Sequence, residues 1–184
     1  MIAEPNTLFL PGKRTAVFAT PGPEHAAEFV DYLKQSAGET EFLIRYPEEL
    51  ADLTAERERA FLAKGLEDPD SLLIGVWVDG RLAGSGALSV PPRKKLCHRG
   101  EVSLSLLRPY WGLGLGAALL EQLEKAGRNR ALRQLEITYI DGNERGRRLY
   151  DRMGYQETGR LPDAVRRRDG TYRDFVQMWK VLSH

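Results

Sequence analysis

A glycine-rich turn between a strand and a helix constrains this chain more than any other feature of its sequence. Val102–Leu107 reads as a strand, and Gly112, Gly114 and Gly116 follow it at the start of the apolar helix near Leu115. The start of a helix presents backbone N–H groups without intrahelical partners and a partial positive charge, so it attracts anions. Glycine has no Cβ, and the backbone can therefore approach a phosphate closely. The turn predicts a site for a nucleotide-type cofactor.

Two known phosphate-binding turns fit less well. An ATP-type P-loop needs Lys followed by Ser or Thr after its last glycine, whereas Ala117 and Ala118 stand here. A dinucleotide fingerprint fits Gly112, Gly114 and Ala117, and Asp141 ends a later strand. A Pro-Tyr-Trp tripeptide, however, separates the strand from the glycines, where that fingerprint needs a tight turn. An NAD(P)-binding oxidoreductase therefore stays an alternative hypothesis.

The hydrophobic pattern predicts an α/β fold with a mixed sheet. Asp79-Gly80 between two apolar runs signals a hairpin. The expected element order is β-αα-βββ-α-β-α-ββ, with strands over 15–20, 72–78, 81–90, 101–107 and 135–141, helices over 26–38, 47–64, 115–128 and 144–153, and a last hairpin that turns at 169–170.

Three segments in register carry a pattern known from one family. They are the glycine turn Trp111–Gly116, the segment Asn143–Tyr155 and the tail Asp169–Met178. Together they resemble the Arg/Gln-x-x-Gly-x-Gly/Ala turn, the N-x-x-A-x-x-L-Y-x-x-x-G-F segment and the closing hairpin of the GNAT superfamily, the acyl-CoA-dependent N-acyltransferases. The resemblance covers about residues 72–182 and implies a mostly antiparallel sheet with splayed central strands. Trp111 replaces the usual Arg or Gln, and Gly146 replaces a small helix former.

The resemblance implies acetyl-CoA as co-substrate. Its pyrophosphate would meet the backbone of the glycine turn, and its pantetheine arm would lie between the splayed strands. A backbone N–H of Leu106 or Leu107 would face the thioester oxygen, Asn143 would cap the next helix and contact the pantetheine, and one arginine of that helix would meet a phosphate. The expected cofactor-binding residues are Leu106, Leu107, Trp111, Gly112, Leu113, Gly114, Leu115, Gly116, Ala117, Asn143 and Arg147.

The same resemblance implies a catalytic pair for direct attack of a primary amine, of a small molecule or a protein, on the thioester. Tyr150 matches the family's general acid, and its reference pKa of about 10 keeps it protonated at neutral pH. Glu101 opens the strand that faces the acetyl group and is the candidate general base, with His98 or water as alternatives. Core packing would also explain Tyr150, and a solvated strand end would explain Glu101.

Acceptor selection is expected in the N-terminal half, which borders the acceptor cleft in this fold type. Glu41 and Glu48 would attract a cationic amine, and Phe42 or Tyr46 would pack on its apolar part. Acidic residues near a helix start also favour the helix dipole without any ligand. A non-catalytic acyl-CoA sensor is a further alternative, since it would bind the cofactor without turnover.

The composition is that of an ordinary globular chain. Its 184 residues, 42% hydrophobic and 29% charged, predict one domain over residues 1–184. The net charge of +1 gives no general attraction to nucleic acid, and no apolar run approaches the ~20 residues of a membrane span. A single cysteine, Cys97, favours a structural thiol in a reducing cytoplasm. No cluster has metal-ligand spacing, so we expect no metal. The chain is compatible with a homodimer.

Overall fold

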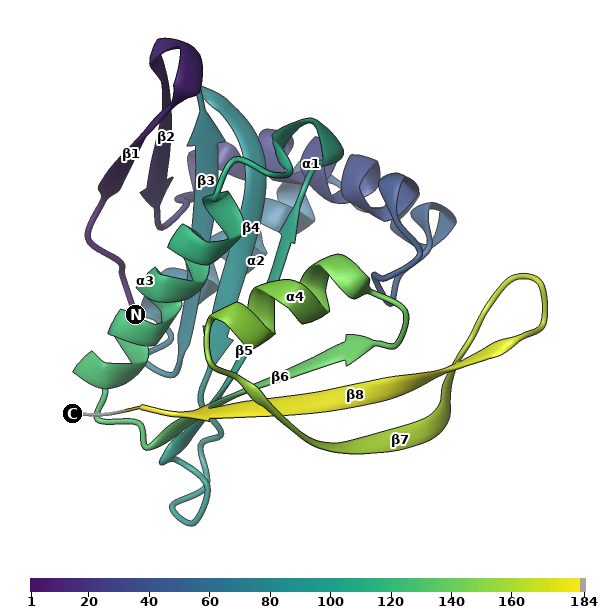
Figure 1. Ribbon diagram of the computed structural model, residues 1–184. Helices are drawn as coiled ribbons and strands as arrows, with labels where there is room; N and C mark the ends of the chain where they lie inside the picture. Colours follow the sequence, from purple (N-terminus) through teal and green to yellow (C-terminus); the bar gives the residue numbers. More distant parts are fainter. Residues whose placement is uncertain (183–184) are drawn as a thin grey trace.

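The computed structural model describes residues 1–182, which form one eight-stranded sheet with four α-helices packed against it (Figure 1). The strand order in the sheet is β1-β2-β3-β4-β5-β6-β8-β7. The strands are β1 (Asn6–Leu10), β2 (Arg14–Ala19), β3 (Ser71–Val78), β4 (Arg81–Ser89), β5 (Arg99–Leu106), β6 (Gln134–Ile140), β7 (Gln156–Arg166) and β8 (Tyr172–Val181). The helices are α1 (Ala26–Glu39), α2 (Ala55–Glu67), α3 (Leu115–Asn129) and α4 (Glu144–Arg152).

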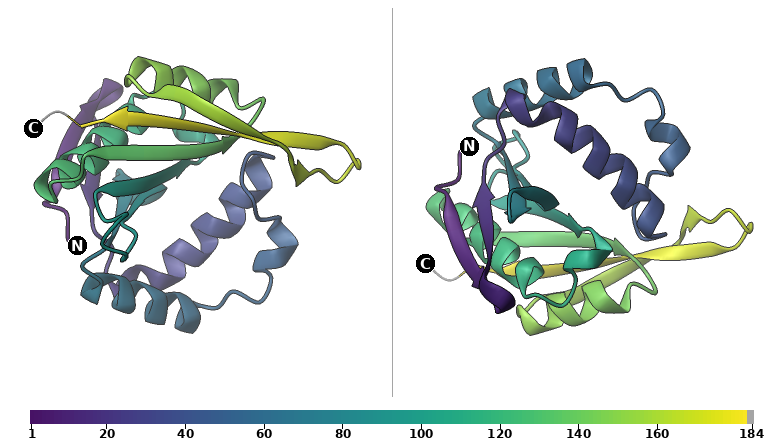
Figure 2. Two further views of the ribbon diagram at one scale, coloured as in Figure 1. Left: turned by 90° about the horizontal axis from the view of Figure 1, so that it is seen from below. Right: turned by 90° about the horizontal axis from the view of Figure 1, so that it is seen from above.

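The helices lie on both faces of the sheet. Figure 2 shows α1 and α2 on one face and α3 and α4 on the other. The larger core cluster lies on the α3 side, where Leu115, Leu119 and Leu123 are fully buried. The smaller cluster contains Phe29 and Tyr32 of α1. α1 and α3 thus each bury an apolar stripe against the sheet, as the helical period requires.

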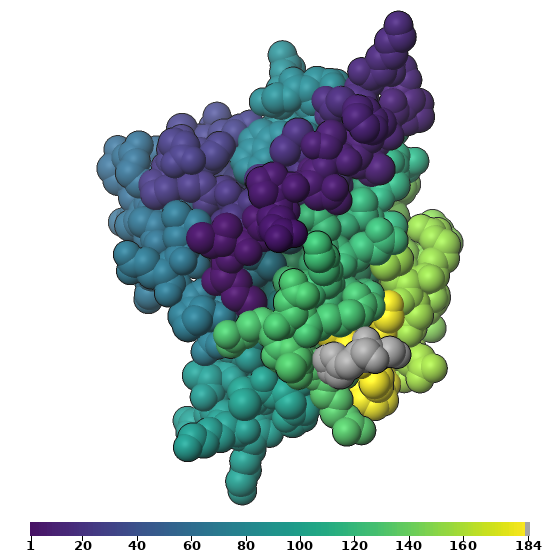
Figure 3. All heavy atoms as spheres, turned by 90° about the vertical axis from the view of Figure 1, so that its left-hand side faces the viewer, coloured from purple at the N-terminus to yellow at the C-terminus, as the bar shows by residue number. Residues whose placement is uncertain are grey.

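The expected elements are confirmed with two differences. The prediction did not include β1. This edge strand has only five residues, and Pro11 and Gly12, which are typical of a turn, follow it directly. Figure 3 shows this N-terminal segment crossing the side of the molecule next to α3. The helix expected over 47–64 is split into a 3₁₀ turn, Pro47–Leu50, and α2. Thr54 begins α2 by accepting a hydrogen bond from the Arg57 backbone N–H at 3.4 Å.

The central strands of the sheet separate, as the resemblance implied. β5 pairs with β4 in antiparallel fashion along its length, from Ser89↔Glu101 to Gly84↔Leu106. The parallel pairing of β5 with β6 ends at Glu101↔Glu136. Beyond that pair the two strands diverge, and α4 lies at the opening between them (Figure 1). Among the helices within residues 1–182, none is long and apolar enough to cross a membrane.

Candidate active site

The turn before α3 presents a row of free backbone donors. Gly112 and Gly114 have φ of 80° and 81°, and Gly114 is the N-cap of α3. Only glycine adopts this left-handed conformation routinely, so the turn requires these residues. Within residues 1–182, no oxygen accepts a hydrogen bond from the backbone N–H groups from Gly112 to Ala117. The turn therefore fits a pyrophosphate by its geometry, beyond its glycine spacing.

Gly116 allows α3 and α4 to pack closely beside this turn. A Cβ at Gly116 would lie 3.1 Å from Leu149 Cδ2, and the side chains of Leu106 and Leu104 are within 4 Å of the same point. The third glycine of the turn thus serves helix packing as well as access to an anion.

The amides of β5 alternate between β4 and the opening. The Leu107 N–H donates to the Ala83 carbonyl at 2.9 Å. Hydrogen-bonded and non-bonded pairs alternate along an antiparallel ladder, so the amides of Leu104 and Leu106 point away from β4 into the opening. Of the two amides expected at the thioester, that of Leu107 is occupied and that of Leu106 is free to donate. The Leu106 carbonyl accepts a hydrogen bond from Trp111 Nε1 at 2.6 Å.

The β6 side of the opening also presents free backbone amides. On β6, the Asp141 N–H donates to the Asp174 carbonyl at 2.9 Å. By the same alternation, the amides of Thr138 and Ile140 face the opening from the other strand. The opening is therefore lined by peptide groups on both sides, which suits an arm that itself carries amides, as pantetheine does.

A cavity of about 740 Å³ occupies the opening. Its lining brings together seven of the residues selected from the sequence: Phe42, Glu101, Leu106, Trp111, Gly116, Asn143 and Tyr150. It also includes Arg145 and Arg148 of α4, Tyr139 of β6 and Phe175 of β8. The volume lies within the range of roughly 300–1,000 Å³ common for ligand pockets.

Tyr150 lies on the wall of this cavity and is 6% exposed. Its ring centroid is 5.5 Å from that of Tyr139 and 6.3 Å from that of Tyr155. Burial, with a smaller effect of Tyr139, raises the pKa of Tyr150 to about 12. The phenol therefore stays protonated throughout the neutral range and can serve as a proton donor.

Glu101 lies where β5 and β6 begin to separate. Its pairing with Glu136 is the last contact between β5 and β6, and its exposed side chain lines the cavity. His98 and Cys97 lie in the preceding turn, and neither lines this cavity. The Cys97 thiol is exposed and donates to the Lys94 carbonyl at 3.3 Å. Of the candidate bases, the geometry favours Glu101.

Asn143 caps α4, as expected. Its Oδ1 accepts a hydrogen bond from the Gly146 N–H at 3.0 Å. A Cβ at Gly146 would lie 2.9 Å from Asn143 Nδ2. The glycine that departs from the family pattern thus makes room for the capping amide.

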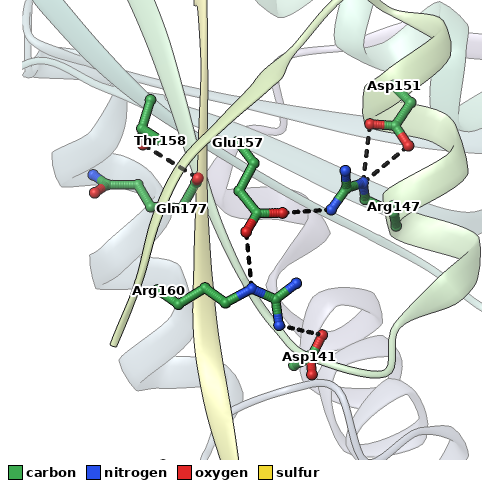
Figure 4. A network of polar contacts seen from close by, with 7 residues as sticks. All are labelled: Asp141, Arg147, Asp151, Glu157, Thr158, Arg160 and Gln177. Carbon is green, nitrogen blue, oxygen red and sulfur yellow. Dashed lines mark hydrogen bonds and ion pairs between the residues drawn. The ribbon is translucent and has the colours of Figure 1, made fainter. Parts of the chain in front are cut away.

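Arg147 does not line the cavity. Figure 4 shows it within an ion-pair network, 2.9 Å from Asp151 and 2.6 Å from Glu157. Glu157 also pairs with Arg160 at 2.8 Å, which in turn reaches Asp141 at 3.3 Å. Hydrogen bonds, foremost one with Tyr139, raise the pKa of Arg147. The geometry gives Arg147 a structural role between α4 and β7.

Two other arginines of α4 line the cavity, which Arg147 does not. Arg145 and Arg148 line the cavity, and the Arg145 guanidinium lies 4.6 Å from the centroid of the Trp111 ring. The sequence contained the signal for this, because residues 145, 148 and 149 share one helical face. Arg147 points to another face.

A second cavity, of about 510 Å³, lies on the other face of the sheet between β4, β5, α1 and α2. Ser103, Leu104 and Ser105 of β5 line both cavities, as does Leu43. The two cavities therefore meet at β5. Sequence reasoning missed the residues that line the second cavity, foremost Phe29, Arg45, Arg57, Glu58 and Phe61.

Hydrogen bonds between one buried and two half-buried hydroxyl groups join α1 to β4 and β5 where the cavities meet. Tyr32 donates to the Ser105 carbonyl at 3.0 Å, and Ser85 Oγ donates to the Tyr32 oxygen at 3.1 Å. The Ser105 hydroxyl also contacts the Tyr32 oxygen. Burial raises the pKa of Tyr32, so the cluster carries no charge at neutral pH.

The predicted acceptor residues lie near the tip of the β7–β8 hairpin. Glu41 pairs with Arg167, and Glu48 pairs with Arg168 at 2.5 Å. The Arg168 guanidinium lies 4.3 Å from the centroid of the Tyr46 ring. These contacts fasten the hairpin to the segment after α1, and Phe42 lines the first cavity. Their role toward an acceptor stays a prediction.

Comparison with known proteins agrees with this architecture. Residues 32–155 match the model of the Acetyltransferase (GNAT) family, and the chain belongs to that family. It is 26% identical over 113 residues to an uncharacterized N-acetyltransferase of Bacillus subtilis, YycN, a match that covers 61% of this chain and 72% of that protein.

Solved structures share the fold. The crystal structure of a GNAT-family acetyltransferase from Streptococcus pneumoniae superposes with a TM-score of 0.84 at 25% identity, over 90% of this chain and 99% of that chain. The structure of yncA from Salmonella typhimurium with its cofactor acetyl-CoA gives a TM-score of 0.78 at 15% identity, over 92% and 95% of the two chains. Within residues 1–182, no group of three or more His, Cys, Asp or Glu side chains is arranged to hold a metal ion.

Proposed function

We propose that this acetyltransferase uses acetyl-CoA to acetylate a primary amine, by direct attack of the amine within a ternary complex. The observation that carries the proposal is the meeting of two cavities at β5. One cavity runs to the free amides of the α3 turn, and the other opens on the α1–α2 face of the sheet. A bound thioester and an acceptor amine can therefore reach the same strand from opposite faces.

The cofactor side uses backbone groups. The N–H groups from Gly112 to Ala117 hold the pyrophosphate, and Arg145 and Arg148 add positive charge beside it. The free amides of Leu104 and Thr138 pair with the pantetheine arm. The structure of yncA with acetyl-CoA, whose fold this chain shares, supports this placement.

The reaction needs three groups on this chain. Glu101 removes a proton from the ammonium, through water, so that the nitrogen can attack the thioester carbon. The Leu106 N–H donates to the developing oxyanion, and such a donor typically contributes ~2.7–4 kcal/mol to the transition state. Tyr150 donates its proton to the departing sulfur as the C–S bond breaks, and it regains a proton from the new amide nitrogen.

A glycine substitution tests the cofactor half of the proposal. Gly114→Val places a β-branched residue at φ 81° and turns the amides of the turn away from an anion, so acetyl-CoA binding should be lost. Gly159→Val is the matched control, because Gly159 lies on β7 with open space around its Cβ position. Calorimetry measures binding, and thermal unfolding shows that both variants are folded. Unchanged affinity in a folded Gly114→Val protein contradicts the proposed site.

A measurement of turnover tests the catalytic half of the proposal. Free thiol released from acetyl-CoA in the presence of an amine library should show acetyl transfer. Binding of acetyl-CoA without turnover by any amine would instead indicate an acyl-CoA sensor.

A further inference from the structure

The second cavity contains three charged side chains without an ion-pair partner. Glu58 of α2 is only 5% exposed, yet no cation lies within 4 Å of its carboxylate among residues 1–182. Its side chain also accepts no hydrogen bond from the described part of the chain. Arg45 and Arg57 line the same cavity, and in the same range neither has a carboxylate within 4 Å.

Two nearby carboxylates, in contrast, have ion-pair partners. Glu41 and Glu48, on the same face of the molecule, are each paired with an arginine of the β7–β8 hairpin. A largely buried side chain whose carboxylate has no hydrogen-bond or ion-pair partner is costly, because it gives up part of its hydration for only a distant attraction. Burial raises the pKa of Glu58, and the attraction of Arg45 lowers it less. The three unpaired charges are therefore complementary to a ligand that carries both signs of charge.

The remaining wall of the cavity is apolar. It is formed by Phe29, Leu33, Leu53, Phe61 and Leu73, and the volume of about 510 Å³ suits a small molecule. Phe61 is 62% exposed, so part of its ring is free to cover a ligand. An apolar group of the acceptor has a place to bind beside the charged groups.

We propose that the acceptor is a small α-amino acid with an apolar side chain. Glu58 binds its ammonium group, Arg45 and Arg57 bind its carboxylate, and Phe29 and Phe61 cover its side chain. This assignment rests on the proposed acetyl transfer and names its substrate class. The two charges of an α-amino acid are separated by one carbon, so a single small ligand can meet both Glu58 and Arg45, which line the same cavity.

The reaction then balances with one proton released. The amino acid nitrogen forms a bond to the acetyl carbon, and the carbon–sulfur bond of acetyl-CoA breaks. The ammonium gives one proton to solvent through Glu101 and a second, by way of Tyr150, to the thiol of coenzyme A. A peptide N-terminus or a diamine lacks the adjacent carboxylate, so both should be poor acceptors.

Three related amines test the charge pattern. L-leucine carries both charges, whereas L-leucinamide and 3-methylbutylamine lack the carboxylate. Thiol release should give L-leucine a kcat/KM about tenfold or more above the other two, because charge-assisted hydrogen bonds to the arginines are lost in them. Arg45→Gln should reduce this preference. Glu58→Gln should raise the KM for L-leucine by about tenfold and change kcat less. L-phenylalanine with phenethylamine repeats the comparison with a larger side chain.

Matched controls lie on the same helix. Arg59 and Glu56 are exposed residues of α2 outside the cavity, so Arg59→Gln and Glu56→Gln should leave the KM for L-leucine unchanged. Equal changes in the control and test variants would overturn the assignment. So would equal kcat/KM for L-leucine and 3-methylbutylamine.

Direct binding separates this inference from the proposed function. If calorimetry shows L-leucine or L-phenylalanine bound in a manner that needs Arg45 and Glu58, but no amine is acetylated, the cavity assignment stands and acetyl transfer fails. If 3-methylbutylamine is acetylated while neither amino acid binds, acetyl transfer stands and the assignment is wrong.

Discussion

The guanidinium of Arg145 lies 4.6 Å from the centroid of the Trp111 ring, and this contact joins α4 to the turn before α3. The indole nitrogen of Trp111 donates to the Leu106 carbonyl at 2.6 Å, which fixes the ring at the mouth of the opening. Trp111 occupies the position where the family turn has Arg or Gln. An arginine of another helix thus lies beside the position where the family turn carries its polar side chain.

Arg145→Gln should therefore weaken acetyl-CoA binding. Loss of one cation beside the phosphates and of its stacking on Trp111 should cost about 1–2 kcal/mol, or a rise of about 5- to 30-fold in Kd. Calorimetry measures this affinity. Arg152→Gln, at the exposed end of α4, and Arg147→Gln, in the ion-pair network of Figure 4, should leave the Kd unchanged. A larger effect at Arg147 than at Arg145 would reverse the assignment of the phosphate contact.

Tyr150→Phe should keep the affinity for acetyl-CoA and lower kcat by roughly ten- to a thousand-fold, in line with the contribution of a general acid. The matched control is Tyr155→Phe, because Tyr155 is also buried but does not line the cavity. Because the pKa of Tyr150 is raised to about 12, its deprotonation should produce no fall in kcat up to about pH 10. Wild-type kcat in the Phe variant would reduce Tyr150 to a packing role.

Local sequence signals predicted the backbone features on the proposed cofactor side of the site. The glycine turn and the cap at Asn143 depend on backbone conformation and on hydrogen bonds a few residues apart, and both are confirmed in the structure. The choice among the arginines of α4 depends on the rotation of that helix, which the burial of Tyr150 and the packing of Leu149 determine. The spacing of four residues between Arg145 and Leu149 was a usable sign of the shared face.

The acceptor side was not predictable in the same way. Its cavity combines α1, α2, β4 and β5, which are far apart in the sequence and meet only through the sheet order. Glu58 lies in a run of four charged residues, Glu56–Arg59, and such a run is typical of a solvated segment. Its burial follows from how α2 packs against α1 and the sheet, and no local pattern encodes that contact.

Glu101→Gln should lower kcat/KM most at acidic and neutral pH. The acceptor amine is then protonated and needs a base, whereas at higher pH more amine arrives deprotonated and the loss should shrink. A pH profile of thiol release against wild type measures this. Glu136→Gln is an unsuitable control, because Glu136 pairs with Arg99. Glu121→Gln is the control instead, because Glu121 is exposed on α3 and lines neither cavity. A uniform loss across pH would indicate substrate binding, and no loss would leave the role to water or His98.

Glu58→Gln should stabilise the free protein as pH rises. Burial raises the pKa of Glu58 in the folded state, so between its unfolded pKa of about 4.3 and the raised value the native state binds more protons than the unfolded state. The free energy of unfolding of the wild type therefore falls as pH increases through this window, and the variant lacks that loss.

Melting temperatures of the two proteins should accordingly be similar near about pH 4 and higher for the variant near about pH 8. Glu56 gives the opposite sign, because a hydrogen bond with its own backbone, followed by one with Thr54, lowers its pKa. Glu56→Gln should thus bring no gain near about pH 8. Saturating L-leucine should raise the melting temperature of the wild type more than that of Glu58→Gln, since the ligand binds the native state and neutralises the buried charge. Equal melting temperatures at both pH values would mean that Glu58 is solvated in the folded protein and does not hold an unpaired charge for a ligand.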